Sequence, residues 1–166
     1  NKPMSKVFYT WSDVESMLSN ITQQMAVENY KPDVILAPGR GGFPPGVMLS
    51  HYFEVPFHGF EWQTRDGAVE DSRHLEQLLS KYIGKNIVII DDINDTGKTL
   101  TGIHSVALGL EKDTNQSIFF LQEGLKYVTL FDKLSSEFGN VLFTAKELDE
   151  VEEQQWIVFP YEEWWT

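Results

Sequence analysis

The stretch NIVIIDDINDTGKTL, residues 86–100, decides the fold class of this 166-residue chain. Its apolar part, residues 87–90, is typical of a strand buried on both faces of a parallel sheet. Asp91 and Asp92 follow at the carboxyl end of that strand, where parallel α/β sheets bind their ligands. The turn at 96–99 then offers hydroxyl and backbone N–H groups at a helix start. The stretch therefore predicts a strand, an acidic loop and a helix that share one ligand site.

The acidic loop and the turn together suit a phosphorylated sugar. Ionised carboxylates accept hydrogen bonds, so Asp91 and Asp92 can take both hydroxyls of a cis-diol or hold a magnesium ion. The N–H groups of residues 96–99 suit a phosphate dianion. These features describe a ribose 5-phosphate site. An acidic phospho-acceptor pocket, as in receiver domains, and a capped helix with solvated aspartates remain alternatives.

Two other motifs fail on their spacing. A P-loop needs a glycine five positions before Gly97, and Asp92 stands there. A calcium-binding loop that starts at Asp92 needs a glutamate at its twelfth position, which is Ile103. The stretch is therefore neither of these sites.

The composition limits the class of partner. With 42% hydrophobic and 23% charged residues, the chain is typical of one soluble domain over residues 1–166. No apolar run approaches the roughly 20 residues of a membrane span, so no membrane partner is expected. Cysteine is absent, which excludes thiolate metal sites and favours a cytoplasmic location. The net charge of -12 argues against nucleic acid but allows a small anion in a local pocket.

Strand-like and helix-like segments alternate along the chain. Helical periodicity is found at 11–29, 75–84, 98–109 and 129–138, with a short helix after the loop at 39–46. Apolar runs typical of strands lie at 32–38, 57–62, 86–90, 141–146 and 156–160. Residues 117–122 fit a strand or part of a buried helix, and the polar stretch 63–74 predicts an exposed loop. This order predicts an α/β domain whose mainly parallel twisted sheet is flanked by helices.

Residues 87–100, IVIIDDINDTGKTL, resemble the phosphoribosyl-pyrophosphate signature of the type I phosphoribosyltransferases. That signature is an apolar strand, two acids and then Asp-Thr-Gly. The resemblance implies that Asp91 and Asp92 address the ribose hydroxyls and Mg2+, and that Asp95 acts at N7 of a purine. It implies that the 5-phosphate is held by Thr96, Gly97, Lys98 and Thr99.

The stretch VILAPGRGGFPPG, residues 34–46, suits the pyrophosphate leaving group. Its glycines let the backbone approach an anion closely, and an arginine offsets the charge. A tight turn alone also explains such a loop. Together with the signature downstream, it resembles the Arg-Gly-Gly pyrophosphate loop of the xanthine–guanine branch. The implied contacts are Gly39, Arg40, Gly41 and Gly42.

Residues from about 62 to 74 occupy the place of the flexible loop that closes over the reacting centre in this family. Arg73 is the candidate there for a contact with pyrophosphate, and a solvated surface arginine is the alternative. The orotate branch uses lysines in this loop, and residues 62–80 contain none. The loop therefore disfavours orotate as the base.

The C-terminal segments VLFTAK and WIVFP resemble the strand and hood that read the base in purine phosphoribosyltransferases. The hood is expected near 1–12 and 144–166. In that family a lysine meets the 6-oxo group and an aromatic ring stacks on the base, which places Lys146, Trp156 and the adjacent Ile157 at the substrate. A second alignment puts Gln122 at the base-reading position and leaves the base open. A buried Trp156 and a solvated Lys146 would have no such role.

The resemblance implies a Mg2+-dependent enzyme of purine salvage. It would move ribose 5-phosphate from phosphoribosyl pyrophosphate to a 6-oxopurine (xanthine, guanine or hypoxanthine) and release pyrophosphate. It would form a homo-oligomer, either a dimer or a tetramer. Transfer to another nucleobase and a non-catalytic sensor of phosphoribosyl pyrophosphate or nucleotides are the alternatives within the same fold.

Overall fold

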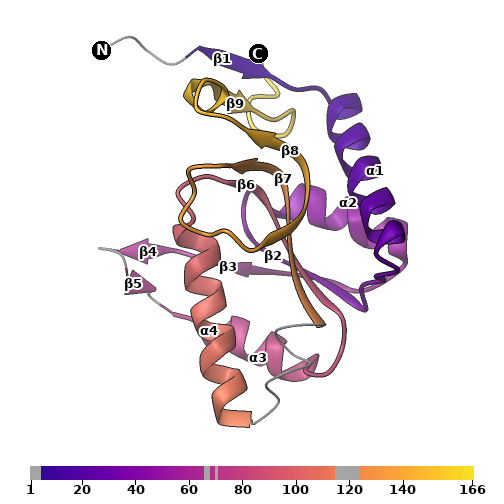
Figure 1. Ribbon diagram of the computed structural model, residues 1–166, viewed down its shortest axis with the longest axis vertical. Coiled ribbons are helices and arrows are strands. Elements are labelled where there is room, and N and C mark those ends of the chain that lie inside the picture. The colour runs from indigo at the N-terminus through magenta and orange to yellow at the C-terminus, as the bar shows by residue number, and fades with distance from the viewer. Residues whose placement is uncertain (1–4, 66–67, 70, 115–123) are drawn as a thin grey trace.

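The computed structural model describes residues 5–65, 68–69, 71–114 and 124–166. Its centre is a five-stranded sheet in the order β3-β2-β6-β7-β8 (Figure 1). All neighbouring strands in this sheet are parallel. The strands are β2 (Val34–Gly39), β3 (Phe57–Glu61), β6 (Ile87–Asn94), β7 (Leu125–Lys133) and β8 (Val141–Leu148). The predicted α/β class with a parallel sheet is confirmed.

Four helices cover the two faces of the sheet: α1 (Trp11–Val27), α2 (Phe43–Phe53), α3 (Arg73–Lys81) and α4 (Lys98–Thr114). The helices α1 and α2 share one apolar core, and α3 and α4 share the other. Thr10 starts α1 with a capping box, in which its hydroxyl accepts from the Asp13 N–H and the Asp13 carboxylate accepts from the Thr10 N–H. The helices α2, α3 and α4 each lie between two parallel strands of this sheet along the chain, as crossover connections require.

The strand β6 contributes to both cores. Val88 and Ile90 pack on the side of α1 and α2, and Ile87 and Ile89 pack on the side of α3 and α4. All four are fully buried. Because helices cover both faces, the strand reads as a continuous apolar run rather than as an alternation.

The predicted helix over 129–138 is wrong, because its first half belongs to β7 and the rest is a turn and connection. Thr129, Leu130 and Phe131 are fully buried between β6 and β8. A short apolar run fits a doubly buried strand as well as a buried helix, so periodicity alone does not separate the two. The chain then reaches β8 through residues 134–140, which contain no helix.

Two smaller differences concern the remaining segments. The predicted exposed loop at 63–74 contains β4 (Thr64–Arg65) and β5 (Ala68–Val69), which pair antiparallel, and the first residues of α3. The strand β6 extends through the predicted acidic loop to Asn94. The segment 117–122 lies outside the described residues.

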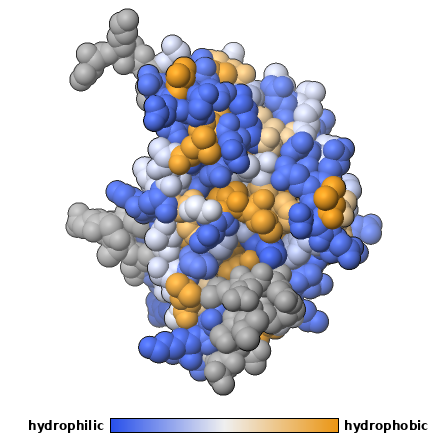
Figure 2. Space-filling view, in the orientation of Figure 1, coloured by the Kyte–Doolittle hydropathy of each residue, from blue (hydrophilic) through white to orange (hydrophobic). Residues whose placement is uncertain are grey.

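The two ends of the chain meet in a separate small sheet. The strand β1 (Lys6–Phe8) pairs parallel with β9 (Trp156–Val158), close to the marked termini (Figure 1). A short 3-10 helix, η2 (Glu152–Gln154), precedes β9. The surface in this view is mainly hydrophilic with smaller apolar patches (Figure 2). Among the described helices, none has the length and apolar character to cross a membrane.

Candidate active site

The two predicted ligand loops meet because β2 and β6 are neighbours in the sheet. A pocket of about 560 Å³ opens where these strands end, and both loops line it. Its lining residues are Arg40, Gly41, Pro44, Asp91, Asp92, Tyr161 and Glu162. The structure therefore brings the glycine-rich loop and the acid pair together. It adds Tyr161 and Glu162, two residues of the predicted hood at 144–166 that were not singled out from the sequence.

The glycine-rich loop lies directly against the acid pair. A Cβ atom on Gly41 would lie 2.5 Å from the Asp92 Oδ2 atom, and one on Gly42 would lie 2.4 Å from the Ile90 carbonyl oxygen. Both contacts are too short for any side chain. The peptide bond between Gly39 and Arg40 is cis. The helix α2 starts immediately afterwards with prolines in its first turn, so its positive end faces the same region.

The acid pair lies deep in this pocket. The Asp91 Oδ1 atom accepts from the Asp92 N–H at 2.9 Å, and the Asp92 Oδ1 atom accepts from the Ile93 N–H at 2.7 Å. Burial raises the pKa of the Asp91 carboxyl, and the neighbouring Asp92 charge raises it further. Burial also raises the pKa of the Asp92 carboxyl. A bound cation, or hydroxyl groups that donate to both acids, would relieve this unfavourable ionisation.

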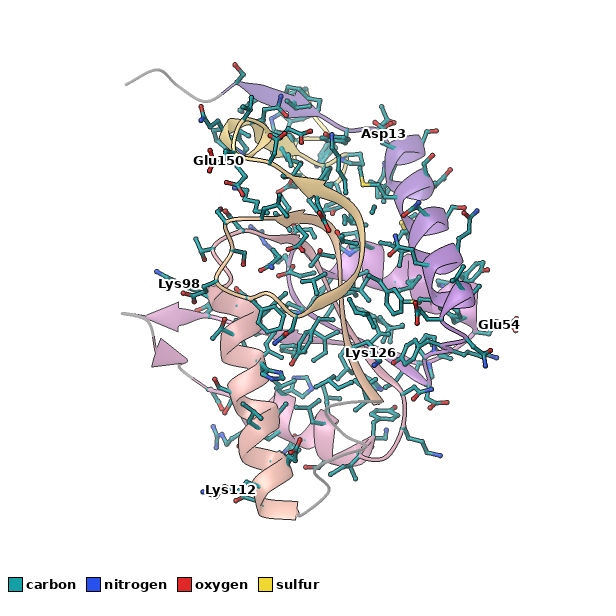
Figure 3. All side chains as sticks on the ribbon, viewed as in Figure 1. Asp13, Glu54, Lys98, Lys112, Lys126 and Glu150 are labelled. Carbon is teal, nitrogen blue, oxygen red and sulfur yellow. The ribbon has the colours of Figure 1, made fainter. Side chains whose placement is uncertain are left out.

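The predicted phosphate turn forms the start of α4, because Lys98 is the first residue of that helix. Figure 3 labels Lys98 at this end of α4 and Lys112 at the other. Gly97 has a φ of +93°, in the left-handed region that favours glycine. The Lys98 N–H donates to the Thr96 hydroxyl at 3.3 Å. The N–H groups of a first helical turn, with the Thr96 and Thr99 hydroxyls nearby in sequence, suit a phosphate dianion.

Lys133 pairs with one of the predicted site residues, although it was not singled out from the sequence. It ends β7, and its Nζ atom donates to the Asp95 Oδ1 atom at 2.7 Å. Its side chain is only 15% exposed, although that of Asp95 is 65% exposed. The available signal was a lysine at the end of the strand that follows the signature helix. Lys133 was not recognised as the end of a strand, because residues 129–138 were predicted to be helical.

Lys146 has a different partner from the one expected of a base-reading lysine. Its Nζ atom lies 2.7 Å from the Glu152 Oε2 atom, and its side chain is 49% exposed. The hydrogen bond to Glu152 raises the pKa of the Lys146 ammonium. Gln122, the alternative at this position, lies outside the described residues.

Trp156 and Ile157 lie on β9 but face different surroundings. The Trp156 ring is 53% exposed, and the Lys6 Nζ atom lies 4.7 Å from its centroid. Lys6 also pairs with Glu163 at 3.0 Å. Trp156 lines a different pocket, together with Lys6, Val158 and Trp165, and it is not among the residues that line the pocket beside the acid pair. Ile157 is buried in the core beside α1 and α2, so only its backbone is available to a substrate.

Arg73 does not line the pocket. It is the first residue of α3, and its guanidinium binds Asp71 at 3.1 Å with 84% of the side chain exposed. The hydrogen bonds between the two groups lower the pKa of the Asp71 carboxyl. Part of the predicted flexible loop at 62–74 lies outside the described residues, so Arg73 stays a prediction as a pyrophosphate contact.

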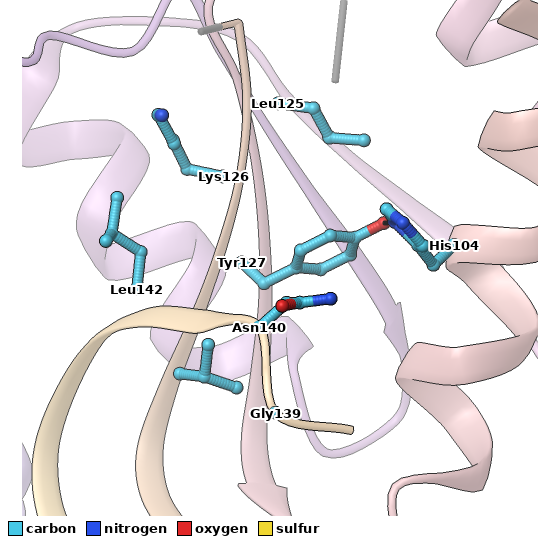
Figure 4. A pocket seen from close by; sticks show the side chains of 8 residues that line it. His104, Leu125, Lys126, Tyr127, Gly139, Asn140 and Leu142 are labelled. Atoms are coloured by element: carbon cyan, nitrogen blue, oxygen red, sulfur yellow. Dashed lines mark hydrogen bonds between the residues drawn. The ribbon is translucent and has the colours of Figure 1, made fainter. Parts of the chain in front are cut away.

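A second pocket, of about 450 Å³, lies at the opposite ends of β7 and β8 (Figure 4). Figure 4 shows the Tyr127 hydroxyl pointing at His104, whose Nδ1 atom is 2.8 Å away. Burial lowers the pKa of the His104 imidazole. This pocket contains none of the predicted site residues, so it is separate from the candidate active site.

The parallel sheet with an acid pair at the end of a central strand, and a glycine-rich loop at the end of the neighbouring strand, defines the type I phosphoribosyltransferase fold. Residues 10–163 match the family of the phosphoribosyl transferase domain. The chain therefore belongs to this family.

Three relatives illustrate the similarity. Hypoxanthine-guanine phosphoribosyltransferase of Schizosaccharomyces pombe is 26% identical over 129 residues, which cover 65% of this chain and 61% of that protein. Hypoxanthine-guanine phosphoribosyltransferase of Saccharomyces cerevisiae is 30% identical over 108 residues, covering 52% of this chain and 48% of that protein. The chain thus spans less than two thirds of these curated relatives. The crystal structure of purine phosphoribosyltransferase from Pyrococcus horikoshii Ot3 is 26% identical with a TM-score of 0.61, covering 96% of this chain and 95% of that one.

Proposed function

We propose that this protein is a purine phosphoribosyltransferase that moves ribose 5-phosphate from phosphoribosyl pyrophosphate to a 6-oxopurine. The observation that carries the proposal is the Lys133–Asp95 pair, which lies next to the phosphate turn at the end of β6. The names of the two yeast relatives, both hypoxanthine-guanine phosphoribosyltransferases, agree with it.

Phosphoribosyl pyrophosphate would bind across the two loops. The turn at 96–99 would hold the 5-phosphate through backbone N–H groups at the positive end of α4. Asp91 and Asp92 would accept hydrogen bonds from the ribose diol. The loop at 39–42 would hold the pyrophosphate, with Arg40 in the same pocket to offset its charge.

Mg2+ fits this arrangement if the substrate completes its coordination. No group of three or more metal-ligating side chains occurs in the parts of the chain that the structure describes. Asp91 and Asp92 would supply protein oxygens, and the substrate would supply the others. The bound ion would stabilise the negative charge of the leaving pyrophosphate.

The base would bind against the Lys133–Asp95 pair, with its O6 atom beside the ammonium and its N7 atom beside the carboxylate. The Lys133 ammonium can donate to the 6-oxo group, and the Asp95 carboxylate can accept from the neighbouring N7 position. A 6-amino group presents donors to the Lys133 donor, so adenine is disfavoured. We therefore assign the base-reading lysine to Lys133 rather than to Lys146, which Glu152 holds. The exposed Trp156 ring would stack on the base, which is worth about 1–3 kcal/mol.

In the reaction, the bond between C1′ of the ribose and the pyrophosphate oxygen breaks, and a bond from the purine nitrogen to C1′ forms with inversion. Positive charge develops on the ribose ring as the leaving group departs. Asp91 and Asp92 lie where they would stabilise this charge. Asp95 would take the proton at N7 or orient it.

One experiment tests the proposal. The protein is incubated with phosphoribosyl pyrophosphate, Mg2+ and, separately, guanine, hypoxanthine, xanthine, adenine, uracil or orotate, and nucleotide and pyrophosphate are measured. We expect equal amounts of both products with at least one 6-oxopurine and far less with adenine. No product with any base would refute the enzyme, and product with adenine alone would refute the role of Lys133.

A further inference from the structure

Asn94 is a buried polar residue whose side chain bonds only to one other segment among the described residues. It is 1% exposed at the end of β6. Its Nδ2 atom donates to the Asp132 Oδ1 atom and to the Phe138 carbonyl oxygen, both at 2.8 Å. Its Oδ1 atom accepts from the Ser136 hydroxyl at 2.9 Å. The amide thus uses both of its hydrogens and its oxygen on residues 132–138, which we call the brace.

The brace also contacts the residues that follow Asn94. Lys133 donates to Asp95, and the Glu137 N–H donates to the Thr96 carbonyl oxygen at 3.0 Å. A Cβ atom on Gly97 would lie 2.5 Å from the Phe138 backbone nitrogen. The proposed base-reading pair and the phosphate turn are therefore both in contact with the brace.

The far end of the brace is fixed to the body of the protein. The Phe138 ring is 5% exposed and lies edge-on to the Tyr127 ring, with centroids 4.9 Å apart. It also contacts the His104 ring of α4, with centroids 5.9 Å apart. The Asn94 amide forms three hydrogen bonds with the brace, whose first two residues are also paired with neighbouring strands of the sheet.

We propose that Asn94 is a positioning residue that sets Lys133 against Asp95 for purine binding. This inference rests on the proposed function. The amide is the one group that can give two hydrogens to the Asp132 and Phe138 acceptors and also accept from Ser136. A leucine of similar size would remove these three hydrogen bonds and leave the buried Phe138 carbonyl oxygen without its Asn94 donor, so the brace would shift. The Lys133 ammonium would move with it.

The test compares Asn94→Leu with Thr129→Val. Thr129 is also fully buried, and its hydroxyl donates to the Thr144 hydroxyl at 3.2 Å, but it lies within β7 and outside the brace. We expect Asn94→Leu to raise the KM for the purine about tenfold or more, as small displacements of reacting groups do. The KM for phosphoribosyl pyrophosphate should also rise, because the brace contacts Thr96 and Gly97 of the phosphate turn. Thr129→Val should change neither constant.

A conservative variant separates positioning from folding. Asp132→Asn keeps an oxygen that accepts from Asn94, so its purine KM should stay near that of the wild type. Asp132→Leu removes the acceptor and should behave like Asn94→Leu. Should Asn94→Leu fail to fold, Ser136→Ala removes one of the three bonds and should give a smaller rise in the purine KM. Equal purine KM values for Ser136→Ala, Asp132→Leu and the wild type would overturn the proposal.

A second readout needs no activity. Hydrogen exchange of the Glu137 amide reports its bond to Thr96, and we expect Asn94→Leu to speed this exchange about tenfold or more relative to Thr129→Val. Unchanged exchange would overturn the role of Asn94 even in an active enzyme. If the wild type made no nucleotide, the proposed function would fail, and the exchange rates would still show whether Asn94 fixes the brace.

Discussion

The Lys133 ammonium and the Asp95 carboxylate lie 2.7 Å apart where the neighbouring strands β7 and β6 end. The pair joins the signature loop to a strand more than 30 positions further along the chain. It presents a donor beside an acceptor, which would complement the O6 acceptor and the N7–H donor of a 6-oxopurine.

Replacing Lys133 by methionine should weaken purine binding. The variant loses a charge-assisted hydrogen bond worth about 1.5–3 kcal/mol, so we expect the purine KM to rise roughly tenfold to a hundredfold. Lys146→Met is the matched control, because Lys146 pairs with Glu152, and it should leave the purine KM unchanged. Steady-state kinetics with each 6-oxopurine measure both. A larger loss in Lys146→Met would return the base-reading role to that residue.

Asp95→Asn should lower kcat much more than it lowers affinity for phosphoribosyl pyrophosphate. The amide keeps an oxygen for Lys133 but cannot take a proton from N7, and such losses cost about a hundredfold or more in rate. Binding of phosphoribosyl pyrophosphate should persist, because the turn at 96–99 is unchanged. Calorimetry and single-turnover rates separate the two effects. Equal loss of both would indicate a structural role for Asp95.

Gly41→Ala should displace the pyrophosphate loop from Asp92, since the new Cβ atom would lie 2.5 Å from the Asp92 Oδ2 atom. We expect affinity for pyrophosphate to fall about tenfold or more. Gly109→Ala is the control, because no atom lies within 4 Å of its added Cβ. That variant should keep full affinity and gain about 0.5–1 kcal/mol of stability from its place in α4. Equal pyrophosphate affinity in both variants would contradict the close approach.

The stability of the ligand-free protein should depend on the ionisation of the acid pair. Because the folded pKa of Asp91 is raised, the folded state binds more protons than the unfolded state at pH values between the unfolded and folded pKa. The free energy of unfolding should therefore fall as the pH rises from about 4 through the raised pKa. Asp91→Asn should remove much of this fall and raise the free energy of unfolding at neutral pH.

Urea unfolding across this pH range, with a chelator present, measures the effect. Phosphoribosyl pyrophosphate with Mg2+ should stabilise the wild type more than the variant, because only the wild type has both carboxylates for the ligand. A wild-type stability that rises with pH over this range would contradict the raised pKa of Asp91.

Much of the fold could be predicted from residues 86–100 and from the order of the other segments. The apolar run of β6 identified a doubly buried strand, and the positions of Asp91, Asp92 and Gly97 identified the end at which a ligand binds. These features are local, because a strand period, a glycine in a left-handed turn and a helix start each need only neighbouring residues.

The region after α4 could not be predicted in the same way. Residues 129–133 have an apolar pattern that suits a helix or a central strand, and only their place between β6 and β8 makes them a strand. That difference decides which lysine lies beside Asp95. It also explains why Lys146 was proposed for a role that the geometry favours for Lys133.

The sequence by itself determined the family signature, the parallel α/β class and the two loops that suit phosphate and pyrophosphate. Tertiary structure alone decided that Lys133 pairs with Asp95, that Asn94 fixes the brace, and that Tyr161 and Glu162 line the pocket. The physical reason is that hydrogen bonds and ion pairs between distant segments depend on which strands become neighbours. No local pattern of side chains specifies which strands become neighbours. The burial of apolar side chains on both faces of the sheet does specify it.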